Sequence, residues 1–124
     1  MEPMIQAKLI LDNEGKPEIV GWRSYKIVLR VIGIPEDTFA VTYSFGETYY
    51  DPVRESRDKK SNFSVELASY GDFEIKAKVR AKSSSRLISR QLSNALQESH
   101  CSSDNYDIKE VLQKIAKTMR EKSG

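Results

Sequence analysis

The feature that most constrains this chain is a regular alternation of apolar and polar residues. The alternation is clearest from Phe73 to Ala81, where every second residue is apolar and the residues between them are charged. Successive side chains of a β-strand point to opposite faces, so this pattern is typical of a strand with one buried face and one solvated face. Lys76, Lys78 and Arg80 share the polar face, and such side chains discourage edge pairing if the strand lies at the margin of a sheet.

The same alternation predicts further strands along the chain. Their apolar rows are Ile5, Ala7, Leu9 and Leu11; Tyr25, Ile27, Leu29 and Val31; Phe39, Val41, Tyr43 and Phe45; and Phe63, Val65 and Leu67. The second row belongs to a strand that becomes apolar on both faces, which predicts a central position in its sheet. Residues 86–96 fit a strand or a helix, because their apolar residues satisfy both periods.

Two predicted loops carry aromatic residues that the strands do not use. Gly46 to Pro52 follows one alternating run, and Ser69 to Asp72 joins two others. Tyr49, Tyr50 and Tyr70 lie in these loops. Because inward residues of the strands build the core, aromatic residues in the turns are available to contact a ligand. The alternative is that they close the ends of a β-sandwich.

Both loops resemble motifs of the YEATS domain family, including its prokaryotic branch. Residues 46–54, GETYYDPVR, follow the family pattern H-x-[ST]-[FY]-x-x-P-x-R except at the first position. Residues 69–73, SYGDF, are similar to the family turn G-[YW]-G-x-F. The resemblance covers about Met4 to Leu96. It implies a mainly β fold, an immunoglobulin-like antiparallel β-sandwich.

The resemblance also implies a function and a site. Eukaryotic members of the family read acylated lysine, chiefly on histone tails, by holding the flat acyl amide between two aromatic rings. By this resemblance Tyr49 and Tyr70 supply the rings and Thr48 offers a hydroxyl to the amide, while the backbone N–H of Tyr70 donates to the acyl carbonyl. Aromatic faces bind such a neutral, planar group well, whereas unmodified lysine would lose its hydration without compensation. The candidate ligand-binding residues are Gly46, Thr48, Tyr49, Ser69, Tyr70 and Gly71.

Other residues of the first loop affect what such a site would accept. Gly46 stands where the family has histidine, so the side chain that walls the pocket is absent. The site then either accepts a larger acyl group or binds no acyl group tightly. Glu47 and Asp51 are acidic and would attract a basic peptide around a modified lysine.

The C-terminal part of the chain predicts one amphipathic helix. Residues 105–121 carry an apolar stripe at helical spacing, preceded by good N-cap residues. We expect a sandwich over residues 1–98, a linker over 99–104 and the helix over 105–121. The stripe packs on its own sandwich, on a second copy or on another protein, and the first is the favoured expectation.

Composition narrows the class of protein. The chain has 124 residues, with 20 Lys and Arg against 18 Asp and Glu, and this near balance argues against a dedicated nucleic-acid binder. A single cysteine allows no internal disulfide, which is typical of a reducing compartment.

We see neither a signal peptide nor a run long enough to span a membrane. The expectation is a soluble intracellular protein, cytoplasmic if prokaryotic.

No residue pattern predicts an enzyme, a metal site or a cofactor. His100 and Cys101 are adjacent, whereas a catalytic pair normally joins residues distant in the chain, and zinc requires about four ligands. Loop acids such as Asp72 are expected to face solvent. The sequence therefore predicts a non-catalytic binding module for an acylated-lysine peptide or another planar ligand. The alternative is a scaffold that acts through the C-terminal helix and binds no acyl-lysine.

Overall fold

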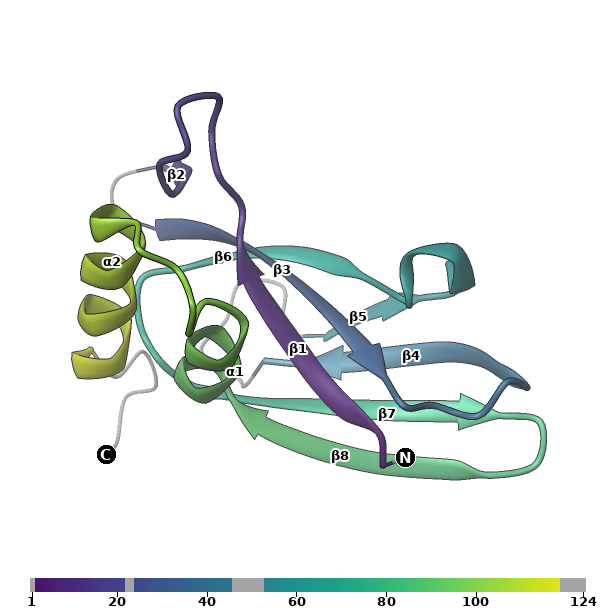
Figure 1. Cartoon of the computed structure of the whole chain (residues 1–124). Helices are drawn as coiled ribbons and strands as arrows, with labels where there is room; N and C mark the ends of the chain where they lie inside the picture. The colour runs from purple at the N-terminus through teal and green to yellow at the C-terminus, as the bar shows by residue number, and fades with distance from the viewer. Residues whose placement is uncertain (1, 22–23, 46–52, 119–124) are drawn as a thin grey trace.

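Two antiparallel sheets packed face to face form the body of the structure (Figure 1). The computed structural model describes residues 2–21, 24–45 and 53–118. The first sheet contains β1 (Met4–Leu9), β2 (Ile19–Val20), β3 (Ser24–Ile32) and β6 (Val65–Ser69), and the second has the order β5 (Val53–Ser56), β4 (Thr38–Ser44), β7 (Glu74–Ala81) and β8 (Ser85–Gln91). This architecture confirms the predicted immunoglobulin-like sandwich.

Strand β3 is the centre of the first sheet, as its two apolar faces predicted. Tyr25 pairs with Ile19 of β2 and with Ser69 of β6, and Ile27 pairs with Leu9 of β1 and with Leu67 of β6. Strands β1 and β2 therefore share one edge of β3, and β6 occupies the other. Every second residue of β3 is buried because both neighbours and the opposite sheet cover it.

The inward row of β7 is buried as its alternation predicted, but Phe39 of β4 is not. The pairing of β4 with β7 shifts in register between Thr38 and Ala40, which turns the Phe39 ring to the outer face of the sheet. Phe39 is 41% exposed, and the guanidinium groups of Arg57 and Arg80 lie 5.9 and 6.0 Å from its ring centroid. A bulge of this kind reverses the face of one residue without ending the strand.

A buried tyrosine joins the two sheets. The hydroxyl of Tyr43, on β4, donates to the backbone carbonyl of Phe63 at 2.7 Å, just before β6 begins. Burial raises the pKa of the Tyr43 hydroxyl because the phenolate would lose its hydration. The ring thus fills the core while its polar end is satisfied by the backbone.

Residues 86–96 divide between the two structures that their pattern allowed. They are a strand up to Gln91, in β8, and from Leu92 they form helix α1 (Leu92–Ser99). A short 3-10 turn, η1 (Lys59–Ser61), is the only other helical element before α2 within the described residues. Helix α1 packs against β1, so it covers one side of the sandwich. The sequence pattern allowed a helix here but did not decide between helix and strand.

The predicted C-terminal helix is present as α2 (Tyr106–Lys117). Asn105 is its N-cap, and the side-chain oxygen accepts from the backbone N–H groups of Asp107 at 2.9 Å and Ile108 at 3.4 Å. The apolar stripe is buried in the same core cluster as the strands: Ile108, Val111, Leu112 and Ile115. Packing within the chain therefore covers this stripe, as expected.

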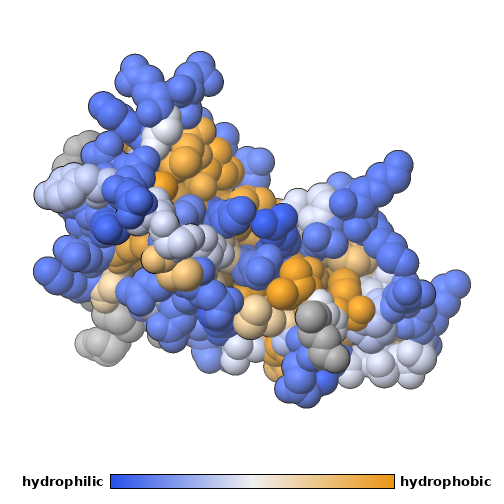
Figure 2. All heavy atoms as spheres, in the orientation of Figure 1, coloured by the Kyte–Doolittle hydropathy of each residue, from blue (hydrophilic) through white to orange (hydrophobic). Residues whose placement is uncertain are grey.

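The surface is largely polar. Figure 2 shows hydrophilic residues over most of the face drawn, with smaller hydrophobic areas between them. Among the described residues, no helix has the length and apolar character needed to cross a membrane.

We predict that Ile115→Ala lowers the free energy of unfolding by about 2–5 kcal/mol, because it leaves a cavity in the core that α2 shares with the strands. Urea unfolding followed by circular dichroism measures the change. Gln113→Ala, at an exposed position of the same helix, is the matched control and should leave stability nearly unchanged. An unfolding midpoint that rises with protein concentration would show that α2 packs on a second copy instead.

Candidate functional site

The two predicted loops begin and end at neighbouring points of the sandwich. The first loop follows Phe45 and the second precedes Phe73, and the two rings meet edge to face with centroids 6.0 Å apart and planes at 83°. The residues that anchor the loops are therefore in contact. Gly46, Thr48 and Tyr49 themselves lie outside the described residues.

Arg54 adds a second connection between the segments that carry the loops. This residue is the last of the first motif, and its guanidinium carbon lies 5.9 Å from the centroid of the Phe45 ring. One of its terminal nitrogens donates to the backbone carbonyl of Glu66 on β6. Strand β6 leads directly into the second loop. The Arg54 bond therefore connects the segment that follows the first loop to the strand that precedes the second loop.

The second turn is held by its own polar groups. The hydroxyl of Ser69 donates to the carbonyl of Gly71 at 2.8 Å and accepts from the N–H of Gly71 at 3.3 Å. Ser69 and Gly71 are buried, whereas Tyr70 between them is half-buried. The turn thus uses Ser69 and Gly71 for its own shape and presents Tyr70 towards the surface.

Asp72 is buried, contrary to the expectation that a loop acid faces solvent. Its two carboxylate oxygens accept from the backbone N–H and the hydroxyl of Ser93, both at 2.8 Å. Ser93 lies in the first turn of α1, where unpaired N–H groups and the helix dipole favour a negative charge. Gln91, the N-cap residue, makes no side-chain capping bond, so Asp72 caps this helix from a distant part of the chain.

The same turn is joined to the C-terminal end of α2. The N–H of Asp72 donates to the carbonyl of Thr118 at 2.6 Å, and the N–H of Leu92 donates to the carbonyl of Phe73 at 2.9 Å. Both helices therefore hold the segment that carries Tyr70. The sequence did not indicate this, because each bond joins residues that are far apart in the chain.

Tyr70 lines a hollow together with Tyr25, Lys114 and Thr118. The hollow has a volume of about 230 Å³ and lies between the start of β3, the second turn and α2. A neighbouring hollow of about 200 Å³ shares Tyr25 and Lys114, so the two follow one side of α2. Helix α2 thus forms a wall beside Tyr70. Lys114 pairs with Glu110 at 3.6 Å on the exposed side of the helix.

His100 has a structural contact, and none that suggests catalysis. Its Nε2 atom accepts from the backbone N–H of Leu9 at 3.1 Å, which links the end of α1 to the end of β1. Burial and, to a smaller extent, the charge of Lys8 lower the pKa of the imidazole. Cys101 is exposed. In the part of the chain that the structure describes, no three His, Cys, Asp or Glu residues are grouped to hold a metal ion.

Comparison with known proteins gives a family and a set of similar folds. The family model described as the prokaryotic YEATS domain matches residues 25–90. The Yaf9 YEATS domain bound to H3K27ac is 18% identical, with a TM-score of 0.50 over 73% of each chain. The Yaf9 YEATS domain recognising an H3K122suc peptide is also 18% identical, with a TM-score of 0.55 over 90% of this chain and 91% of that one.

A further structure, of the yeast AF-9 homolog protein Yaf9, is 21% identical, with a TM-score of 0.52 over 73% of this chain and 65% of that one. At these identities the similarity to the solved structures concerns the fold. No curated protein matches the chain.

We predict that Asp72→Ala lowers the free energy of unfolding by about 1–3 kcal/mol, because the first turn of α1 loses both of its bonds to the carboxylate. The amide resonances of Tyr70 and Ser93 should also shift in an ¹H–¹⁵N spectrum. Asp104→Ala makes the same change at an exposed position before α2 and should neither lower stability nor shift these resonances. Equal stability of the two variants would contradict a capping role for Asp72.

We predict that His100 makes stability depend on pH. Its folded-state pKa is lowered, so its contribution is complete above the ordinary histidine value of 6.5 and is lost as the pH falls through the lowered pKa. His100→Gln retains a neutral acceptor and should remove this part of the pH dependence in denaturant unfolding. The chain has one histidine, so its imidazole resonances report the pKa directly. A titration midpoint above 6.5 would contradict the assignment.

Proposed function

Because its residues 25–90 match the family model, this chain belongs to the prokaryotic YEATS domain family, and we propose that it is a non-catalytic binding module for acylated lysine. In this proposal the flat, neutral acyl group lies between the rings of Tyr49 and Tyr70. Thr48 contacts the amide through its hydroxyl, and the backbone N–H of Tyr70 donates to the acyl carbonyl. Gly46, Ser69 and Gly71 shape the remainder of the site.

The observation that carries this proposal is the contact between Phe45 and Phe73. Each ring belongs to the residue next to one of the two loops, and their centroids are 6.0 Å apart. Loops that leave the sandwich from adjacent points can bring one aromatic ring each to the same ligand. A site assembled from loops on a rigid sheet is a common arrangement for binding proteins.

The surroundings of Tyr70 also favour a binding role. Tyr70 is half-buried and lines a hollow together with Tyr25, so two tyrosines contribute to the same surface hollow. The Ser69 hydroxyl donates to the Gly71 carbonyl and the Asp72 carboxylate accepts from the Ser93 N–H, so hydrogen bonds fix the backbone on either side of Tyr70. A turn that is already held in place loses little conformational freedom on binding, which favours affinity.

The similar structures support an acylated peptide as the class of ligand. The Yaf9 YEATS domain is described in two structures, one bound to H3K27ac and one recognising an H3K122suc peptide. For this chain we propose a basic peptide with one acylated lysine, because Glu47 and Asp51 in the first loop would attract cationic neighbours. The absence of a side chain at Gly46 leads us to propose an acyl group larger than acetyl.

The alternative, a scaffold that pairs through α2, has less support. The apolar stripe of α2 is already buried in the core of its own chain, with Ile115 fully buried. The opposite face presents charged residues such as Lys109 and Glu110. A partner would have to bind this polar face, which lacks the apolar core typical of a stable protein interface.

We predict that short basic peptides with crotonyl-lysine or acetyl-lysine shift the amide resonances of residues 69–72 in an NMR titration, whereas unmodified peptide does not. Tyr70→Ala should weaken this binding about tenfold or more, because one stacking face is lost. Tyr70→Phe should retain it, because the ring remains.

Tyr106→Ala is the matched control. Tyr106 is 74% exposed at the start of α2, so the same truncation there should leave both the fold and the affinity unchanged. Circular dichroism of the Tyr70→Ala protein establishes that it is folded. If no acylated peptide shifts the spectrum, or if Tyr70→Ala binds as tightly as the unchanged protein, this chain is not a reader of the proposed kind.

A further inference from the structure

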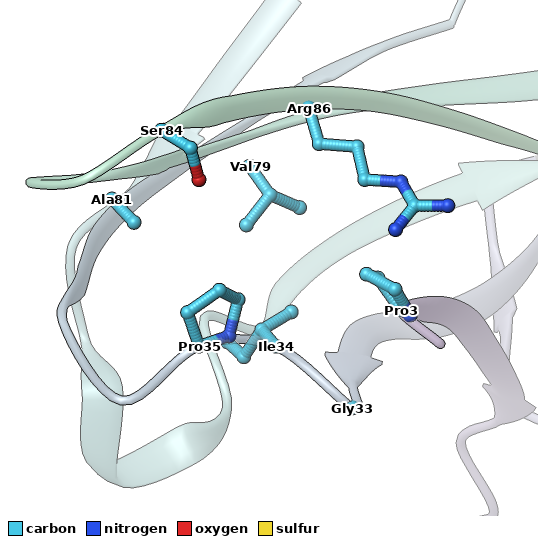
Figure 3. Close-up of a pocket in the computed structure, with 8 residues that line it drawn as sticks. All are labelled: Pro3, Gly33, Ile34, Pro35, Val79, Ala81, Ser84 and Arg86. Carbon is cyan, nitrogen blue, oxygen red and sulfur yellow. The ribbon is translucent and has the colours of Figure 1, made fainter. Parts of the chain in front are cut away.

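A further cavity lies at the end of the sandwich opposite to the turn that carries Tyr70. It has a volume of about 300 Å³ and lies between the start of β1, the turn after β3 and the β7–β8 hairpin. Figure 3 shows the side chains around it: Pro3, Gly33, Ile34, Pro35, Val79, Ala81, Ser84 and Arg86. The Tyr70 turn and this cavity adjoin opposite ends of β3, so the full length of that strand separates them.

The interior of this cavity is apolar and its rim is polar. Val79 and Ala81 come from the inward row of β7, and Ile34 and Pro35 approach them from the other sheet (Figure 3). Gly33 has a φ of +69°, a conformation that glycine adopts without strain and that lets the chain turn sharply after β3. The hydroxyl of Ser84 and the guanidinium of Arg86 are the polar groups of the lining.

Arg86 is unusual because it projects from the inner face of β8. It pairs with Val79 of β7, and Arg90 pairs with Ile75, so both arginines share the face of the core residues. The two arginines differ in their surroundings. Arg90 is 18% exposed, donates to the carbonyl of Ile5 at 3.0 Å and pairs with Glu98 at 3.3 Å.

The ion pair of Arg86 is weaker than that of Arg90. Its guanidinium lies 3.5 Å from the carboxylate of Glu2, and the two side chains are 54% and 86% exposed. An ion pair this exposed contributes little, because water competes for both charges. Arg86 is therefore a cation at the rim of an apolar cavity with an easily displaced carboxylate beside it.

We propose that this cavity binds a short aliphatic carboxylate. The alkyl chain lies against Val79, Ala81 and Ile34, where it is removed from water. The carboxylate accepts two hydrogen bonds from the Arg86 guanidinium, whose planar fork matches a carboxylate. Glu2 competes with the ligand for Arg86 and so weakens its binding.

The proposal is tested by an ¹H–¹⁵N NMR titration of the full chain with sodium hexanoate. Saturable shifts are expected at Gly33, Ile34, Ala81, Ser84 and Arg86, with a dissociation constant on the order of a millimolar, as for a small ligand with one charged group. Hexanamide has the same shape without the charge and should bind at least tenfold more weakly. Acetate should also bind more weakly, by roughly twofold to fourfold for each methylene that it lacks and that hexanoate buries.

Two variants test the roles of the charged groups. Arg86→Gln should weaken hexanoate binding about tenfold or more, whereas Lys78→Gln, which removes a cation from the outer face of the same sheet, should have little effect. Glu2→Gln should strengthen binding by roughly twofold to fivefold, because the competing carboxylate is removed. Because Arg86→Gln and Lys78→Gln each remove one positive charge, the difference between them would distinguish a direct role of Arg86 from a change in overall charge.

Several results would overturn the proposal. These are an absence of saturable shifts, shifts confined to other residues, equal binding of hexanoate and hexanamide, or unchanged binding in Arg86→Gln. The cavity is remote from Tyr70, so failure here leaves the acyl-lysine proposal untouched. Binding of hexanoate that is unaffected by Tyr70→Ala would show in turn that the two sites are separate.

Discussion

The carboxylate of Asp72 connects the parts of this molecule that the sandwich alone would leave separate. It caps the first turn of α1 through Ser93, while the backbone N–H of the same residue bonds to Thr118 at the end of α2. The turn that carries Tyr70 is thus held by two helices as well as by the strands on either side. A buried carboxylate is costly unless its lone pairs are satisfied, and here each oxygen has a donor. The geometry beside Tyr70 depends on this satisfied charge.

Much of the sandwich could be predicted because its strands repeat a simple pattern. The row from Phe73 to Ala81 is buried as its alternation indicated, and β3 is central as its two apolar faces indicated. Local pattern failed where a distant residue decides the structure. Phe39 faces outward because a register shift separates it from its row, and α1 begins at Leu92 because Asp72 caps it. The register shift has no signal in the neighbouring residues, and the pattern of residues 86–96 allowed both a strand and a helix without deciding where one ends and the other begins.

In the candidate site, too, some residues could be predicted from the local sequence and others are brought in by packing between distant parts of the chain. Tyr70 could be identified from its place in a motif, and the contact of Phe45 with Phe73 places the ends of both loops together. Tyr25 and Lys114, which share the hollow with Tyr70, could not be identified, because their positions follow from how α2 packs on the start of β3. The assignment of Tyr49, Thr48 and Gly46 still rests on the motif, since these residues lie outside the described part of the chain.

The bonds around Asp72 also have a consequence for the order of events during synthesis. Strands β1, β3, β6 and β4 are complete before Ser93 is made, and Thr118 follows 25 residues later still. A chain still emerging from the ribosome can therefore pair most of its strands while the Tyr70 turn lacks both of its helical supports. We expect the turn to reach its final geometry only after these last segments have docked. In the proposed function, binding at Tyr70 would then require that both helices have been made and have docked.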